Sequence, residues 1–247
     1  MTGEVRVVPL LGIPEIEEGD DLAALLVEAA ARAGGLADND VLVVAQKVVS
    51  KKEGRVVHLE EVEPSPEARE LAGDEDPRRV EVILRESRRV VRSRPPLVIA
   101  ETRHGFVCAS AGVDSSNAKG PGTVVLLPLD PDASARSIRT RLPGAPAVVI
   151  ADSLGRAWRL GQADVAIGCA GLVPIDDRRG TRDAGGRELI ATMDAIADQA
   201  ASAAALVRDK AGRDAVVVVR GLERYVTADD GPGAAAIVRP RAEDLFP

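Results

Sequence analysis

Aromatic side chains are scarce in this sequence, since Phe, Tyr and Trp together make up 2% of its 247 residues. Proteins that bind single-stranded nucleic acid stack the bases on several aromatic rings, and this chain has too few rings for such a surface. Its formal net charge of -7 also argues against general affinity for phosphate backbones, which attract proteins with an excess of Lys and Arg. We therefore expect no nucleic-acid partner.

Cysteine and histidine are also rare, with two residues of each. Cys108 and Cys169 have no CxxC spacing, which argues against a zinc or iron–sulfur site. No apolar run reaches the roughly 18 residues of a membrane span, and residues 1–8 lack the basic, apolar and small-residue succession of a signal peptide. We expect a cytoplasmic protein without a membrane partner.

Apolar residues make up 45% of the chain, and charged residues of mixed sign make up 29%. This composition is typical of an ordered globular protein with a sizeable core. Strand-like and helix-like patterns mix without a regular strand-helix-strand rhythm, which predicts an α/β or α+β fold with mixed sheets and packed helices. We expect one structural unit over residues 1–247, which could comprise two subdomains. The clearest patterns predict strands over 5–10, 41–45, 106–111, 123–127, 147–151, 165–168 and 216–219, and helices over 22–31, 66–72, 77–87, 132–142 and 194–210.

Asp152 and Ser153 directly follow the apolar strand predicted over 147–151. A carboxylate and a hydroxyl at a strand end are hard oxygen ligands that suit Mg²⁺ or Mn²⁺. The structural alternative is that Asp152 caps the next segment and Ser153 only forms a turn.

Asp114 and Asn117 belong to a polar loop after the strand predicted over 106–111. Asp114 could share a metal with Asp152, and the Asn117 amide could hold a nucleotide or a phosphate. An Asp-Ser-Ser-Asn sequence is also an ordinary turn.

Lys47 and Lys51 follow the buried strand predicted over 41–45. If this segment is extended, side-chain alternation places both lysines on one face, where they could bind phosphate. The structural alternative is a solvent-exposed charged hairpin. Together the three groups indicate a metal-assisted phosphate site without naming a reaction.

Four segments in this order resemble the coenzyme F420-0:L-glutamate ligase family, also called gamma-glutamyl ligases. They are QKVVSKKEGR over 46–55, ETRHGFVCASAGVDSSN over 101–117, LPLDPDAS over 127–134 and DSLGRAWRLGQ over 152–162. The similarity extends from about residue 11 to residue 221.

This resemblance implies a GTP-dependent ligase that adds L-glutamate to the lactyl carboxylate of the deazaflavin coenzyme precursor F420-0. An acyl phosphate would be the intermediate, and further glutamates would follow in gamma linkage. Mg²⁺ or Mn²⁺ would assist phosphoryl transfer, and K⁺ could bind as an additional cation. The resemblance also implies an unusual α/β fold and an intertwined homodimer. Some relatives carry a C-terminal flavin reductase domain, which we do not expect here.

By the same resemblance, Asp114 and Asp152 are expected to be catalytic and to bind the metal together with Ser153, which replaces a family threonine. Lys210 stands where the family has a metal-binding Gln or Glu. The expected nucleotide contacts are Ile13, Pro14, Glu15, Ile16, Gln46, Lys51 and Asn117, with Gln46 replacing a serine of several relatives.

Two alternatives remain open from the sequence. One is a related ATP- or GTP-dependent carboxylate–amine ligase with another acceptor, and the other is a non-catalytic protein that binds a nucleotide or coenzyme. The number of glutamates added, the chemical form of the precursor and the strictness for GTP over ATP are also open.

Overall fold

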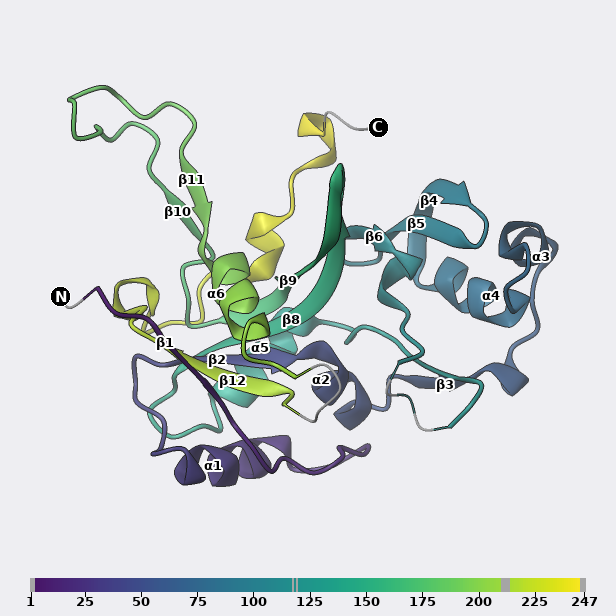
Figure 1. Ribbon diagram of the computed structural model, residues 1–247, viewed down its shortest axis with the longest axis horizontal. Coiled ribbons are helices and arrows are strands. Elements are labelled where there is room, and N and C mark those ends of the chain that lie inside the picture. Colours follow the sequence, from purple (N-terminus) through teal and green to yellow (C-terminus); the bar gives the residue numbers. More distant parts are fainter. Residues whose placement is uncertain (1–2, 117, 119, 210–213, 245–247) are drawn as a thin grey trace.

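The computed structural model describes residues 3–116, 118, 120–209 and 214–244 (Figure 1). A five-stranded sheet forms its centre. Its strands in spatial order are β1 (Arg6–Pro9), β12 (Val216–Arg220), β2 (Val41–Ala45), β8 (Ala147–Arg156) and β9 (Arg159–Ala170). β2 and β8 run parallel, whereas the other neighbouring pairs are antiparallel. The prediction of a mixed sheet with packed helices is therefore confirmed.

Helices cover both faces of this sheet, which explains why its central strands are apolar throughout rather than alternating. Leu42 and Val44 of β2 face one hydrophobic core, and Val41 and Val43 face the other. The first core is covered by α1 (Leu22–Arg32), α2 (Gln46–Lys52) and α5 (Pro131–Arg139), and the second by α6 (Ile196–Ala205). None of the described helices is long and apolar enough to cross a membrane.

A second lobe, shown beside the central sheet in Figure 1, has its own core around Ile83, Val98 and Val124. Two small sheets and two helices form most of it. They comprise β3 (Val56–His58) paired with β7 (Thr123–Val125), the sheet of β4 (Ser87–Arg94), β5 (Leu97–Thr102) and β6 (Val107–Ala109), and the helices α3 (Pro66–Ala72) and α4 (Pro77–Arg85).

A long arm built on β10 (Ile175–Asp177) and β11 (Met193–Ala195) projects from the central sheet (Figure 1). Short 3-10 helices complete the described chain. They are η1 (Leu59–Glu61), η2 (Ser110–Gly112), η3 (Glu223–Tyr225), η4 (Ala234–Ile237) and η5 (Arg241–Glu243).

The segment after β2 is the helix α2, so the extended conformation considered for Lys47 and Lys51 is wrong. Val48 and Val49 are buried against the core of the central sheet, and a helix is the conformation that lets both pack there. Gly54 ends the segment with a φ of +67°, which glycine adopts without strain. The two lysines still share a face, because they are four residues apart on a helix.

Other expected bounds also change. The strand expected over 165–168 is part of the longer β9, and the helices expected over 77–87 and 132–142 are α4 and α5, which end at Arg85 and Arg139. β8 continues through Asp152 and Ser153 to Arg156, because it stays paired with β9 beyond the buried region. The strand expected over 106–111 ends at Ala109, since Ser110 and Ala111 adopt positive φ and turn the chain. The helix expected over 194–210 spans only Ile196–Ala205, and Arg208 beyond it is directed toward β9.

Candidate active site

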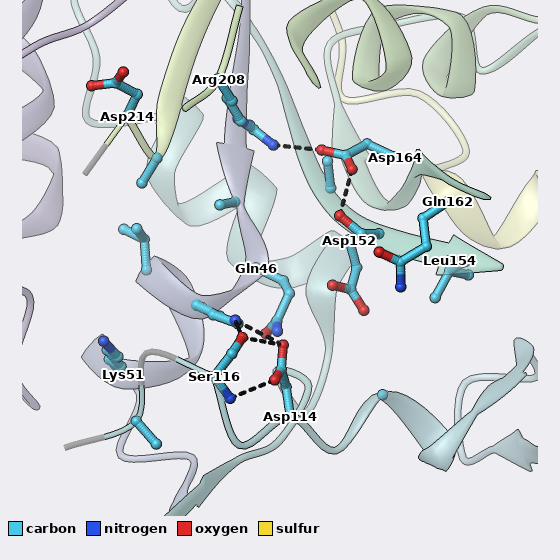
Figure 2. Close-up of a pocket in the computed structure, with 18 of the residues that line it drawn as sticks. Gln46, Lys51, Asp114, Ser116, Asp152, Leu154, Gln162, Asp164, Arg208 and Asp214 are labelled. Carbon is cyan, nitrogen blue, oxygen red and sulfur yellow. Dashed lines mark hydrogen bonds and ion pairs between the residues drawn. The ribbon is translucent and has the colours of Figure 1, made fainter. Parts of the chain in front are cut away.

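A cavity of about 800 Å³ lies between the central sheet and the second lobe (Figure 2). The loop before α1, the start of α2, the turn at η2, the β8–β9 ribbon and the segment after α6 form its walls. Every expected site residue that the structure describes lines this cavity, namely Ile13, Pro14, Glu15, Ile16, Gln46, Lys51, Asp114, Asp152 and Ser153. Asn117 and Lys210 lie outside the described residues.

The parallel pairing of β2 with β8 places two of these side chains at the same edge of the sheet. Ala45 is the register partner of Ala151, so Gln46, the first residue of α2, and Asp152, which is still within β8, follow neighbouring positions of the two strands. Asp114 comes from the second lobe, where it forms a β-bridge with Val125. Figure 2 shows Asp114 and Asp152 facing the same space.

The turn at η2 returns the chain toward the cavity just before Asp114. Ser110 and Ala111 have φ values of 55° and 50°, which are uncommon for residues other than glycine. Arg79 of α4 holds this turn, because its Nη2 donates to Ser110 Oγ at 3.2 Å and to Val113 O at 3.4 Å. Asp114 is thus placed by a fixed turn and not by a loose loop.

Asp114 is paired with a cation from α2. Lys47 Nζ lies 2.7 Å from Asp114 Oδ2, and the Ser116 backbone N–H donates to Oδ1 at 2.7 Å. Burial alone would raise the pKa of Asp114, but the contacts with Lys47 and Ser116 outweigh it and hold the pKa below its ordinary value. Asp114 is therefore ionised at neutral pH.

Asp152 has no such cation in contact among the described residues. The pKa of Asp152 is raised to about 6, mainly by burial and also by the nearby charges of Asp114 and Asp164, against the opposing hydrogen bond from the Ser153 backbone and the charge of Lys47. The carboxylate therefore lies where a positive charge from a ligand would be favourable.

Asp164 and Arg208 form a buried ion pair in the cavity wall that the sequence interpretation missed. Arg208 Nη1 lies 2.9 Å from Asp164 Oδ2, and the two side chains are 8% and 4% exposed. Ser153 Oγ donates to the other carboxylate oxygen at 2.6 Å. The signal that could have revealed Asp164 is a single carboxylate at the start of the apolar run 163–170.

Gln46 is almost completely buried, at 1% exposed, although it lines the cavity. Its Oε1 accepts a hydrogen bond from Ser50 Oγ at 2.8 Å. Its Nε2 has no hydrogen-bond partner among the described residues. A buried donor without a partner is costly, so a ligand with an acceptor atom would be favoured here.

The oxygen donors fit a Mg²⁺ or Mn²⁺ site of one particular kind. Among the described residues no three His, Cys, Asp or Glu side chains gather closely enough to enclose a metal. Mg²⁺ is commonly held by one or two carboxylates, with water and substrate phosphates completing its shell. Asp114, Asp152 and the Ser153 hydroxyl match that donor set, and the mutual repulsion of the carboxylates would be relieved by a cation.

The F420-0:Gamma-glutamyl ligase family model matches residues 11–221, a range that includes every residue lining the cavity. This chain belongs to that family. The coenzyme F420:L-glutamate ligase of Methanothermobacter thermautotrophicus is 43% identical to it, over 98% of both chains. The coenzyme F420:L-glutamate ligase of Methanopyrus kandleri is 46% identical, over 98% of this chain and 97% of its own. The Methanocaldococcus jannaschii protein of the same name is 42% identical over 85% of each chain.

Membership in the gamma-glutamyl ligase family confirms the resemblance drawn from the four segments. Three of those segments supply separate walls of the cavity: 46–55 contains α2, 101–117 contains the η2 turn and Asp114, and 152–162 contains the outer part of the β8–β9 ribbon. The segment 127–134 instead begins α5, where Asp132 accepts the backbone N–H groups of Cys169 and Ala234. That segment supports the fold and does not line the cavity.

Proposed function

We propose that this protein joins L-glutamate to the terminal carboxylate of the coenzyme F420 precursor in a GTP-dependent reaction. The observation that carries the proposal is one cavity whose walls lie within the family-matched residues. These walls bring together carboxylates, lysines and an amide donor that has no partner among the described residues. Relatives that share more than two fifths of the sequence bear the name coenzyme F420:L-glutamate ligase.

The chemistry needs two group transfers in one site. A precursor carboxylate oxygen attacks the γ-phosphorus of GTP, the bond to the bridging oxygen breaks, and GDP leaves. The glutamate amine then attacks the acyl phosphate carbonyl, inorganic phosphate departs with the bonding electron pair, and the amine loses a proton. The product is an amide, and one GTP is converted to GDP and phosphate.

A bound Mg²⁺ or Mn²⁺ would supply positive charge over the phosphate oxygens. In the chain itself, Lys47 and Lys51 would offset phosphate charge from one face of α2. Both lysines contact carboxylates of the chain, Lys47 with Asp114 and Lys51 with Glu15. A nucleotide phosphate would therefore compete with Glu15 for Lys51.

Gln46 would add a directed contact to this charge. Its Nε2 can donate to a phosphate or base acceptor of the nucleotide without breaking an existing hydrogen bond to the described chain. The relatives' serine and this glutamine can both donate a hydrogen bond, so the replacement keeps the chemistry while extending the reach of the donor.

Mass spectrometry of the precursor, incubated with protein, GTP, Mg²⁺ and L-glutamate, tests the proposal. We expect the precursor to gain glutamate residues while GDP and phosphate accumulate in equal amounts. Parallel reactions with ATP, with other carboxylate acceptors and without glutamate separate the proposed activity from a related ligase. An unmodified precursor under conditions where the protein is folded and binds GTP would refute it.

A further inference from the structure

The Ser153 side chain can play one of two roles in the proposed site. A hydroxyl carries one proton and two lone pairs, so it can donate to a nucleotide phosphate or offer its oxygen to a cation. Which role it plays depends on where its proton is held. The contacts of Ser153 with β9 bear on this choice.

Asp164 is the register partner of Ser153 across β8 and β9, and its Oδ1 lies 2.6 Å from Ser153 Oγ. The opposite carboxylate oxygen accepts from Arg208 Nη1 at 2.9 Å. An ionised carboxylate has no proton to donate. The Ser153 hydroxyl must therefore be the donor in this contact, so its proton is held by Asp164 and is not available to a ligand in the cavity.

Three further contacts keep this arrangement rigid. Arg208 Nη2 donates to Val43 O at 3.1 Å, which ties the guanidinium to the central sheet. Ser202 Oγ of α6 donates to Asp164 O at 2.7 Å. Asp198, one helical turn earlier, accepts from the Ala166 backbone N–H at 2.9 Å. Helix α6 thus holds the β9 backbone at Asp164 and two residues after it.

We propose that Asp164 is a positioning residue, held by Arg208, that orients the Ser153 hydroxyl so that its oxygen serves as a ligand for the divalent cation and not as a donor to phosphate. Asp164 acts through Ser153 and does not itself touch the cation. Arg208 cancels the charge of Asp164, so the pair adds orientation without adding net charge to the site. This inference rests on the proposed function, because it requires a cation in the cavity.

The test is Mn²⁺ binding to the full chain without nucleotide. Binding is measured from the decrease in the electron paramagnetic resonance signal of free Mn²⁺. The informative variant is Asp164→Ala/Arg208→Met, which removes the carboxylate and the guanidinium together and leaves the net charge unchanged. Removing a buried pair together is tolerated far better than removing one partner. Ser153→Ala and the triple variant that combines all three changes complete a double-mutant cycle.

We expect Ser153→Ala and Asp164→Ala/Arg208→Met each to weaken Mn²⁺ binding, on the order of tenfold, as is usual for groups that orient a metal ligand. The triple variant should bind no more weakly than either, since both changes remove the same oriented oxygen. A purely structural role would make the losses additive. Ser153→Thr keeps the hydroxyl and should retain affinity.

The matched control is Asp40→Ala/Arg220→Met. This pair joins β2 and β12 at 3.1 Å, with Asp40 also buried, and neither residue lines the cavity. It should lower the unfolding temperature without changing Mn²⁺ affinity. The inference would be overturned, with the proposed function left intact, by either of two results. One is that Asp164→Ala/Arg208→Met binds Mn²⁺ as tightly as the wild type. The other is that Ser153→Ala weakens GTP binding in EDTA but does not weaken Mn²⁺ binding. If the wild type binds no Mn²⁺ with or without GTP, the proposed cation site fails and the inference fails with it.

Discussion

Single carboxylates in this protein differ in their electrostatic environment because their neighbours differ. Asp114 is balanced by Lys47 and Asp164 by Arg208, whereas Asp152 faces both carboxylates with no cation in contact among the described residues. Three chemically identical side chains that line one cavity therefore have different charged neighbours. Substitutions at this scale separate a ligand role from a folding role.

Asp152→Asn tests whether this carboxylate only supports the local fold. As a proposed ligand for the cation over the transferring phosphate, Asp152 would lose a full negative charge in a nearly isosteric change. We expect kcat to fall by on the order of a hundredfold or more. The melting temperature in metal-free buffer should stay the same or rise, because burial and the charge of Asp114 disfavour the ionised carboxylate. The measurement pairs that melt with kcat at saturating Mg²⁺ and GTP. A normally melting variant that keeps most of its kcat would remove Asp152 from the catalytic residues.

Lys51→Ala tests the proposed phosphate contact on α2. Charged hydrogen bonds contribute about 1.5–3 kcal/mol, so the KM for GTP should rise by roughly tenfold or more, with little change in the KM for glutamate. Lys52→Ala is the matched control, because Lys52 neighbours Lys51 on α2 but does not line the cavity. Equal effects on the two KM values would contradict the assignment.

At the scale of elements, α6 is both a cover for the central sheet and a support for the cavity wall. Its small apolar residues Ala197, Ala200, Ala201 and Ala204 pack closely on the sheet. Asp198 contacts the backbone of β9 from the same helix. The helix stops at Ala205 so that the chain can direct Arg208 to Asp164.

Asp198→Asn is predicted to stabilise the fold in a pH-dependent way. Burial raises the pKa of Asp198, against the opposing hydrogen bond from Ala166. The folded chain therefore holds this proton more tightly than the unfolded chain, and ionisation costs stability as the pH rises through the unfolded and then the folded pKa. Asparagine carries no charge and keeps an acceptor for Ala166. Urea denaturation should show a higher free energy of unfolding for the variant at pH 8, and this gain should vanish at a pH well below the ordinary pKa of 3.8. An equal gain in free energy at high and at low pH would contradict this cause.

At the scale of the whole molecule, two extensions leave apolar side chains in solvent. Leu160 on the β8–β9 ribbon is 99% exposed, and Ile190 and Met193 on the arm are 83% and 45% exposed. Figure 1 shows the arm projecting away from the central sheet. Exposed apolar side chains on projecting elements are typical of surfaces that meet another protein chain.

We predict a homodimer, as the family resemblance implies. Size-exclusion chromatography with light scattering should give twice the chain mass at micromolar concentration. Ile190→Asp combined with Met193→Asp should shift the protein toward the monomer, because charges replace apolar contacts on the arm. Leu97→Asp, an exposed apolar position in the second lobe at 51%, serves as the control. A monomeric wild type would refute the prediction.

The amino-acid sequence was enough to predict the mixed α/β class, the approximate positions of the central strands and the expected site residues that line the cavity, but not Asp164 and Arg208. Continuous apolar runs such as 41–45 and 147–151 require burial on both faces, which only strands covered by helices provide. The four family segments indicated Asp114, Asp152 and Lys51 together, because their order and spacing are specific even though each alone could be an ordinary turn or surface charge.

The pairing of opposite charges, by contrast, became known only from the three-dimensional arrangement of the chain. Asp164 and Arg208 lie 44 positions apart in the chain, and their ion pair exists because α6 returns the chain to β9. The same holds for Lys47 with Asp114, which joins the central sheet to the second lobe. α2 likewise became a helix because Val48 and Val49 pack into a core that no local pattern specifies. Periodicity records which residues must be buried, but pairing across the chain depends on the spatial arrangement of elements.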